Sequence, residues 1–323
     1  MTTKIDMGLL MALIRKDKVS IDEVANHFKV SPNEAMQAIK QLQKGRVLLN
    51  VEQDTISLGK QVRPVDEPFV IDFRKHVEVV TPIGFIADTH IGSKYERLDA
   101  LNNFYDRCVQ LGVKQVFVAG NIIEGDSRFN TFSTYVRGVN DQTKNFIEKF
   151  PYRRGITTYF ITGDDHEGWY IQRDNLNIGE YIELKANDSG RKDLIYIGHL
   201  ERDIEFTQAN GSSIVRVIHA GGGSAYAISY TSQKYVESLQ GGEKPAVVVI
   251  GHFHKFDWSY PREVHCIQPA SFKDQDDWMR KKRIQSIVGG CICWLRQCDL
   301  GHFTSVKVEF FPYFDKKFYT HQW

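Results

Sequence analysis

One pattern recurs along this chain and constrains its fold more than any other feature. Five times, a short apolar segment ends and residues of the kind that bind metal ions follow at once. These residues are Asp88 and His90 after GFIA, Asn121 and Glu124 after VFVAG, Asp164, Asp165, His166 and Glu167 after YFITG, His219 after IVRVI, and His252 and His254 after AVVVIG. Because α/β folds collect their sites at the carboxyl ends of strands, the pattern predicts that loops bring these side chains together.

The residue types at these positions indicate divalent metal ions. A single histidine after a strand is most often a hydrogen-bonded loop residue, but five such clusters in one chain are hard to produce by chance. Imidazole mixed with carboxylate suits Mn, Fe, Zn or Ni, whereas Mg and Ca prefer oxygen ligands alone. We therefore expect divalent metal ions as cofactors, with Mn as the first choice and Fe, Zn, Ni or Mg as alternatives.

The segments between these clusters indicate an α/β fold. The apolar strands alternate with amphipathic segments that predict helices near residues 95–111, 134–149 and 176–185. Beyond these, the chain becomes mostly strands. Helices outside and two sheets inside would accommodate both halves.

The whole series resembles the calcineurin-like metallophosphoesterase superfamily. The segments that carry the resemblance are D-x-H at 88–90, GNIIE at 120–124, GDDHE at 163–167, His219 and GHFH at 251–254. They occur in the order and at the spacing of that family, over about residues 80–310. The resemblance implies a four-layer αββα sandwich with two metal ions at the strand ends.

The resemblance also implies a role for each residue. One ion would be held by Asp88, His90, Asn121 and His254, and the other by Asn121, Asp165, His219 and His252. A water activated by the two ions would attack phosphorus as hydroxide, and His166 would be the acid near the leaving oxygen.

Two positions depart from the family pattern. The family normally has GD where this chain has Gly120-Asn121, and GNH where it has Asp164, Asp165 and His166. One carboxylate is lost and one is gained, so we favour an active site in which Asp165 replaces the missing bridging carboxylate. A degenerate site, or an asparagine placed deliberately to silence an enzyme for crystallisation, are the alternatives.

The first sixty residues predict a separate domain. An apolar stretch from Met7 to Arg15 predicts a first helix. Ser20 with Glu23 and Ser31 with Glu34 form two helix-capping patterns, and two short strands follow. Three helices and a hairpin in this order resemble a winged helix-turn-helix. We expect this domain at 1–60, a linker rich in proline and charge at 61–79, and the phosphoesterase domain at 80–323.

DNA is the partner that these features favour. Residues 1–65 carry ten Lys or Arg against seven Asp or Glu, a net of +3. The expected contacts lie on the second capped helix and in WMRKKR, and they are Asn33, Gln37, Lys40, Gln41, Lys44, Arg280, Lys281, Lys282 and Arg283. The winged helix would otherwise serve as a protein or homodimer contact, and nothing in the sequence indicates a partner ATPase.

Three functions remain open from the sequence. The segment IQPASFKDQDDW resembles the DNA repair exonucleases of the superfamily, which favours a metal-dependent DNA phosphodiesterase or nuclease. A small-molecule or nucleotide phosphoesterase with a regulatory winged helix is the second reading. A catalytically degenerate DNA-binding factor is the third, and Asn121 is the main argument for it.

Composition limits where the protein acts. The formal charge of the chain is +1, so any nucleic-acid binding must come from local patches. Five cysteines, an odd number, and the lack of a long apolar run or signal peptide predict a cytoplasmic protein without membrane contact. A compact enzyme with a DNA-binding domain is also of a kind that phage genomes encode, which would place it in the host cytoplasm.

Overall fold

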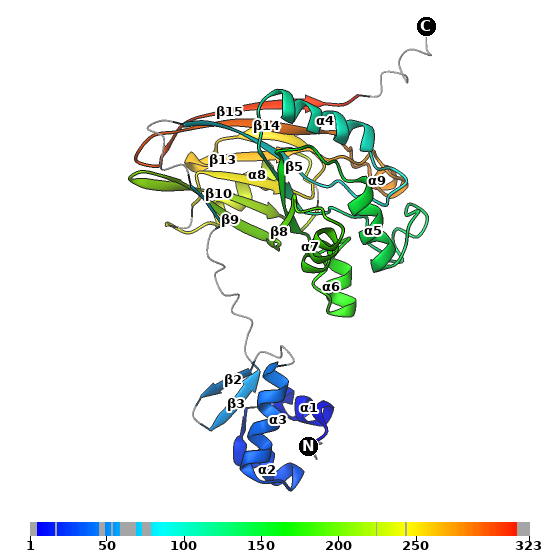
Figure 1. Cartoon of the computed structure of the whole chain (residues 1–323), viewed down its shortest axis with the longest axis vertical. Helices are drawn as coiled ribbons and strands as arrows, with labels where there is room; N and C mark the ends of the chain where they lie inside the picture. Colours follow the sequence, from blue (N-terminus) through cyan, green and yellow to red (C-terminus); the bar gives the residue numbers. More distant parts are fainter. Residues whose placement is uncertain are drawn as a thin grey trace. The chain divides into compact units, whose positions relative to one another are not determined.

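The chain divides into two compact units, Met1–Asp66 and Glu67–Trp323 (Figure 1). The computed structural model describes residues 5–16, 18–44, 49–52, 54–58, 69–72, 79–223, 225–242 and 244–314. In that part of the chain, every helix falls short of the length and apolarity that crossing a bilayer requires.

The first unit combines three helices with short strands. Its elements are α1 (Met7–Lys16), β1 (Val19–Ser20), α2 (Ile21–Phe28), α3 (Pro32–Lys44), β2 (Leu49–Glu52) and β3 (Thr55–Leu58). The strands described here form a sheet in the order β1-β3-β2. Leu10, Val24, Ile39 and Ile56 are fully buried in the core of this unit, so the helices and the hairpin share one apolar interior.

Both predicted helix-capping patterns are confirmed. The Ser20 side chain accepts from the Glu23 amide, and the Glu23 carboxylate accepts from the Ser20 amide. The same reciprocal pair joins Ser31 and Glu34 at the start of α3. Each pair satisfies amide groups that have no partner within the helix, which fixes where α2 and α3 begin.

The second unit is a mixed α/β fold. Its elements in chain order are β4 (Phe69–Asp72), β5 (Val79–Ile86), α4 (Leu98–Gln110), β6 (Gln115–Ala119), α5 (Val139–Lys149), β7 (Thr157–Thr162), α6 (Gly168–Asp174), α7 (Ile178–Asp188), β8 (Leu194–His199), β9 (Glu201–Gln208), β10 (Gly211–His219), α8 (Tyr230–Ser238), β11 (Val247–Gly251), β12 (Phe256–Ser259), the 3₁₀ turn η1 (Pro261–Glu263), β13 (His265–Pro269), α9 (Asp277–Lys282), β14 (Gly289–Gln297) and β15 (Phe303–Pro312).

Two sheets form the centre of this unit. Among the described residues, one sheet has the order β15-β14-β5-β6-β7-β8 and the other has the order β12-β13-β11-β10-β9-β4. Strands β5 to β8 are parallel neighbours, and β11 is parallel to β10 and β13. The expectation of an α/β fold with two sheets is confirmed.

Alternation along the strands explains how the layers stack. In β6, Val116 and Val118 face a cluster shared with α4, α5 and α7, while Phe117 and Ala119 face the cluster between the sheets. In β11, Val247 and Val249 enter the cluster between the sheets, and Val248 and Ile250 join a cluster with Val236 of α8. Successive side chains point to opposite faces of a strand, so strands buried on both faces read as continuous apolar runs.

One segment predicted as linker belongs to a sheet. Within 61–79, residues 69–72 form β4, which pairs in parallel with β9. Phe69 and Ile71 pack against the cluster between the sheets. The linker prediction is therefore wrong for these four residues, because FVID can bury alternate apolar side chains against an available sheet edge. Residues 61–68 and 73–78 lie outside the described part of the chain.

Candidate metal centre

The predicted site residues lie at the carboxyl ends of five strands. Asp88 and His90 follow β5, Asn121 follows β6, and Asp165 follows β7. The loops are joined through the backbone, since the Asp88 amide donates to the Gly120 carbonyl at 3.0 Å and the His90 amide to the Asn121 carbonyl at 2.9 Å.

The facing sheet supplies the remaining histidines. His219 is the last residue of β10, and His252 and His254 follow β11. The His252 amide donates to Asp88 Oδ2 at 2.8 Å, which ties the loop after β11 to the loop after β5. The two sheets therefore meet at this edge.

Left-handed backbone conformations are concentrated at this edge. Positive φ angles occur at Asp88, His90, Asn121, His166, His252 and His254. Such a conformation costs a residue with a side chain roughly 1–3 kcal/mol, and it persists only where the surroundings impose it. The strain indicates that the loops are held for a function rather than for stability.

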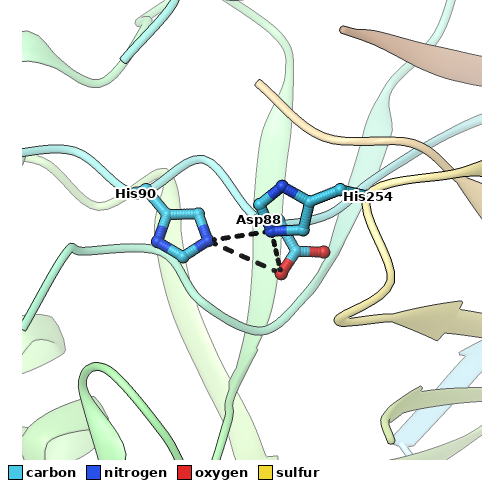
Figure 2. A group of neighbouring side chains, drawn as sticks. All are labelled: Asp88, His90 and His254. Carbon is cyan, nitrogen blue, oxygen red and sulfur yellow. Dashed lines mark hydrogen bonds and ion pairs between the residues drawn. The ribbon is translucent and has the colours of Figure 1, made fainter. Parts of the chain in front are cut away.

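Asp88, His90 and His254 form the first cluster (Figure 2). The Nε2 atoms of His90 and His254 are 3.2 Å apart, and they lie 3.8 Å and 3.5 Å from Asp88 Oδ1. All three side chains are buried. Burial raises the pKa of Asp88, but His254 and His90 outweigh it and hold the pKa well below the usual value, so the carboxylate is ionised.

Asp165, His219 and His252 form the second cluster. Asp165 Oδ1 is 3.2 Å from His219 Nε2, and Asp165 Oδ2 is 3.5 Å from His252 Nδ1. Burial lowers the pKa of His219, but the hydrogen bond to Asp165 and the charges of Asp88 and Glu167 raise it to about 10. Without a metal ion, Asp165 and His219 are therefore an ion pair at neutral pH.

Each of the four histidines in the two clusters has one ring nitrogen in a hydrogen bond to a residue outside its cluster, and the other ring nitrogen points into the cluster. His90 Nδ1 bonds the Glu124 carboxylate at 3.0 Å, and His254 Nδ1 bonds the Ser286 hydroxyl at 3.2 Å. His219 Nδ1 donates to the Ala119 carbonyl at 2.8 Å, and His252 Nε2 donates to the Gly222 carbonyl at 2.9 Å. Outer partners of this kind fix the tautomer and the orientation of metal-ligating imidazoles.

Three of the predicted metal ligands each have a buried atom that lacks a hydrogen-bond partner among the described residues. These atoms are Asp88 Oδ1, Asn121 Oδ1 and His252 Nδ1. A buried polar atom without a partner costs about 1–3 kcal/mol, so a group of them marks a place where something else binds. Carboxylate oxygen, amide oxygen and imidazole nitrogen are all electron-pair donors, and these residues therefore fit a divalent cation.

Asn121 faces the second cluster. Its Oδ1 atom lies 2.8 Å from the point where a Cβ on Gly163 would sit, and His219 Nε2 lies 2.9 Å from the same point. The backbone amides of Asn121 and Gly163 both donate to Glu167 Oε1, each at 2.8 Å. Glu167 thus joins the loops after β6 and β7, a role that the sequence did not reveal.

A buried charge network behind His90 also escaped prediction. Lys273 Nζ lies 3.2 Å from Glu124 Oε2 and 2.8 Å from Asp276 Oδ2, and all three residues are buried. Glu124 had been noticed only as a polar residue after a strand. The segment that contains Lys273 stands out in the sequence only through its resemblance to the DNA repair exonucleases, because a buried lysine can be recognised only from the partners that the fold brings to it.

His166 lies beside the first cluster and is partly exposed. Its Nδ1 donates to the Glu124 carbonyl at 2.8 Å, and its ring packs edge-on to His90 and against Trp169. Burial, and then the neighbouring His90, lower the pKa of His166 to about 4. The metal-free protein at pH 7 therefore holds a neutral imidazole whose Nε2 is an acceptor.

Comparison with known proteins assigns the chain to a family. A family model described as a calcineurin-like phosphoesterase superfamily domain matches residues 82–286. The chain belongs to this superfamily. No curated protein matches it significantly. Membership in the calcineurin-like phosphoesterases supports a hydrolase that uses divalent metal ions.

Several solved structures are similar to the chain. An archaeal phosphodiesterase has 13% identity and a TM-score of 0.41, over 72% of this chain and 100% of that chain. A single mutant of Vps29 from Entamoeba histolytica has 11% identity and a TM-score of 0.35, over 72% and 100%. A hypothetical protein from Pyrococcus horikoshii has 12% identity and a TM-score of 0.37, over 75% and 92%.

The residues predicted to contact DNA are all on helices or directly after one. In α3, Asn33, Gln37, Lys40 and Gln41 are exposed, and the side chain of Lys44 lies outside the described residues. In the phosphoesterase unit, Arg280, Lys281 and Lys282 belong to α9, and Arg283 follows them in a left-handed conformation. All four of these cations are exposed. Their contact with DNA stays a prediction.

Proposed function

We propose that the protein is a metal-dependent phosphodiesterase that cleaves DNA. The observation that supports this most strongly is the pair of adjacent clusters in which four imidazoles each have one nitrogen anchored and one directed inward. Asp88, His90 and His254 would hold one ion, and Asp165, His219 and His252 the other. Mixed nitrogen and oxygen ligands suit Mn, Fe, Zn or Ni, and we propose Mn²⁺ as the first choice among them.

Asn121 and Asp165 would together replace the bridging carboxylate that the family pattern has at the position of Asn121. The side-chain oxygen of Asn121 is neutral and buried, and it has no hydrogen-bond partner in the described part of the chain, so it can complete a coordination shell but adds no charge. Asp165 would supply the anion, next to His219 and His252. Two cations held close together need such negative charge beside them.

Cleavage of a phosphodiester requires a group that donates a proton to the leaving oxygen, and His166 is our candidate for this role. When bound, the ions would neutralise phosphate charge and lower the pKa of a water molecule. His166 would be a neutral imidazole before substrate binds, since its pKa is about 4 in the metal-free protein. An anionic phosphate beside the ring raises that pKa, so Nε2 would take up a proton from solvent when substrate binds and donate that proton to the leaving oxygen.

Three features favour DNA as the substrate. The order of elements in the first unit, with three helices and a sheet β1-β3-β2, supports the proposal of a winged helix-turn-helix whose recognition helix is α3. The cations of α9 provide a second basic surface in the phosphoesterase unit. The segment around Lys273 resembles the DNA repair exonucleases, and Lys273 contacts Glu124, which bonds the candidate ligand His90.

The proposal is tested by elemental analysis together with Mn²⁺-dependent cleavage of labelled DNA. The unaltered protein should hold two ions per chain and cleave, and Asp165→Asn should lose the second ion and most of the cleavage. Asn121→Asp should keep both. An unaltered protein with empty sites and no cleavage, in which Asn121→Asp restores both, would identify this loop as the place where activity was switched off.

A further inference from the structure

A loop beside His166 displays aromatic side chains to solvent. The loop begins at Gly125, where an added Cβ would lie 2.2 Å from the His166 carbonyl oxygen, so it starts in contact with the catalytic candidate. Phe129 is 68% exposed and Phe132 is 88% exposed. The Arg128 guanidinium lies 4.9 Å from the centre of the Phe129 ring.

The loop is held in place although its aromatic side chains are exposed. Buried Asn130, between the two phenylalanines, donates to the carbonyls of Glu124 and Gly125 at 3.0 and 3.2 Å. Gln142 of α5 donates to the Gly125 carbonyl at 2.7 Å. Phe129 and Phe132 are exposed although hydrogen bonds fix the loop that carries them. Exposed apolar side chains on such a fixed loop indicate a binding surface.

This loop is continuous with the basic helix α9. The Lys94 amide donates to the Ser133 carbonyl at 2.7 Å, and Ser93 pairs with Thr134. On its other side the segment 93–97 pairs Glu96 with Lys273, and the Asp274 amide donates to the Tyr95 carbonyl at 2.9 Å. Segments 127–135, 93–97 and 273–283 therefore form one surface, which we call the rim.

The rim carries both aromatic rings and positive charge. Trp278 on α9 is 53% exposed, and the exposed cations Arg280 to Arg283 follow it. The acidic groups nearby are largely engaged: Asp276 pairs with Lys273 at 2.8 Å, and Asp126 lies 3.9 Å from Arg137. Asp277 is 82% exposed, 4.0 Å from Arg280. The net charge of α9 and its cap thus favours a polyanion.

We propose that the rim binds a single-stranded segment of nucleic acid and leads it to the metal centre. Phe129 and Phe132 would stack on unpaired bases, and Arg280 and its neighbours would contact the phosphates. Unpaired bases expose the faces that aromatic side chains need, whereas a duplex hides them, so the rim selects single strands. This inference rests on the proposed phosphodiesterase function and names the form of its substrate.

The first experiment separates binding from chemistry. Fluorescence anisotropy in EDTA measures the affinity for a labelled oligothymidine and for the same strand annealed to its complement. Hydrolysis of bis(p-nitrophenyl) phosphate with Mn²⁺ reports on phosphodiester chemistry without a nucleobase. For Phe129→Ala/Phe132→Ala we expect the single-strand Kd to rise about tenfold or more, with a smaller change for the duplex.

The same double variant should also change substrate preference. Its ratio of kcat/KM for the oligothymidine to kcat/KM for the small diester should fall by about tenfold. Tyr152→Ala is the matched control, because Tyr152 is 56% exposed and precedes β7 at the edge away from the metal centre. It should leave both ratio and Kd unchanged.

The charge of α9 is tested by salt dependence. Arg280→Gln/Lys282→Gln should flatten the slope of log Kd against log salt concentration by about 1.4 units, as expected for the loss of two phosphate contacts to a single strand. Exposed Lys114 and Lys192 precede β6 and β8, and replacing both by Gln should leave the slope unchanged.

The outcomes distinguish the inference from the function on which it rests. Unchanged single-strand affinity in the phenylalanine double variant, or an equal loss for single strand and duplex, would overturn the role of the rim. A protein that hydrolyses neither DNA nor the small diester, yet binds single strands through Phe129 and Phe132, would instead overturn the phosphodiesterase function and leave the rim as a binding surface.

Discussion

Two glycines allow the His219 ring to reach the metal centre. A Cβ on Gly163 would lie 2.7 Å from His219 Cδ2, and a Cβ on Gly120 would lie 2.4 Å from His219 Nδ1. Gly120 also has a φ of +80°, where a side chain is disfavoured. The glycines that precede Asn121 and Asp164 in the sequence are thus required by the histidine that packs on them.

Substitution of Gly120 should therefore damage the second cluster. We expect Gly120→Ala to lower the free energy of unfolding of the second unit by about 2–4 kcal/mol, since backbone strain and a displaced imidazole add together. Metal binding at the second cluster should weaken with it. Chemical denaturation and elemental analysis measure the two effects.

Gly190→Ala is the control for the backbone contribution. Gly190 has a φ of +82°, but nothing lies within 4 Å of an added Cβ. Its substitution should cost only about 1 kcal/mol and leave metal content unchanged. Equal losses for Gly120→Ala and Gly190→Ala would mean that contact with His219 contributes nothing.

At the level of elements, strands with a clear apolar pattern were predictable and mixed strands were not. The apolar runs that became β6, β7, β10 and β11 were read correctly from the sequence, as were the helices that became α4, α5 and α7. β9, whose sequence is ERDIEFTQ, was missed because Ile204 and Phe206 are its only apolar residues. Such a strand is specified by its neighbours β10 and β4 rather than by its own residues.

The residues of the metal centre were also predictable only in part. Residues such as Asp88 and His219 were predictable, because ligand types recur directly after strands. Partners such as Ser286 and the Ala119 carbonyl were not, since any residue with the right polar atom can orient an imidazole. The basic residues of α9 in the rim were predicted as contacts for DNA, but the loop 127–135 was not, because exposed phenylalanines in a loop carry no periodic pattern.

Lys273 links α9 to the metal centre and offers a test of this network. Lys273→Met would leave Glu124 and Asp276 without their cation, so the free energy of unfolding should fall by about 3–5 kcal/mol. Adding Glu124→Gln should recover part of the loss. Thermal and urea unfolding of the single and double variants measure the coupling.

An exposed ion pair provides the comparison. Lys144 Nζ lies 3.9 Å from Glu148 Oε1 on the surface of α5, where the lysine side chain is 75% exposed. Lys144→Met should change stability by less than about 1 kcal/mol. A similarly small effect for Lys273→Met would contradict a structural role for the buried network.

At the scale of the whole molecule, the two units should respond differently to metal. Each has its own core, and the candidate ligands all belong to the second unit. An ion at about 100 times its Kd stabilises the state that binds it by about 2.7 kcal/mol. Mn²⁺ should therefore raise the melting temperature of the second unit by roughly 5–10 °C, and a chelator should reverse this without moving the transition of the first.

The pH dependence of metal uptake follows from the ion pair in the second cluster. His219 has a pKa of about 10 in the metal-free protein, so it is protonated at pH 7 and must lose its proton before Nε2 can bind an ion. Since the ion displaces a proton, a higher pH favours the bound state. The Kd of the second ion should fall about tenfold per pH unit between pH 6 and pH 8 for each proton released.

Titration calorimetry in two buffers of different ionisation enthalpy counts that proton. Uptake without proton release would mean that His219 is not a ligand, while loss of pH dependence in His219→Gln, with the first ion still bound, would assign the proton to this residue.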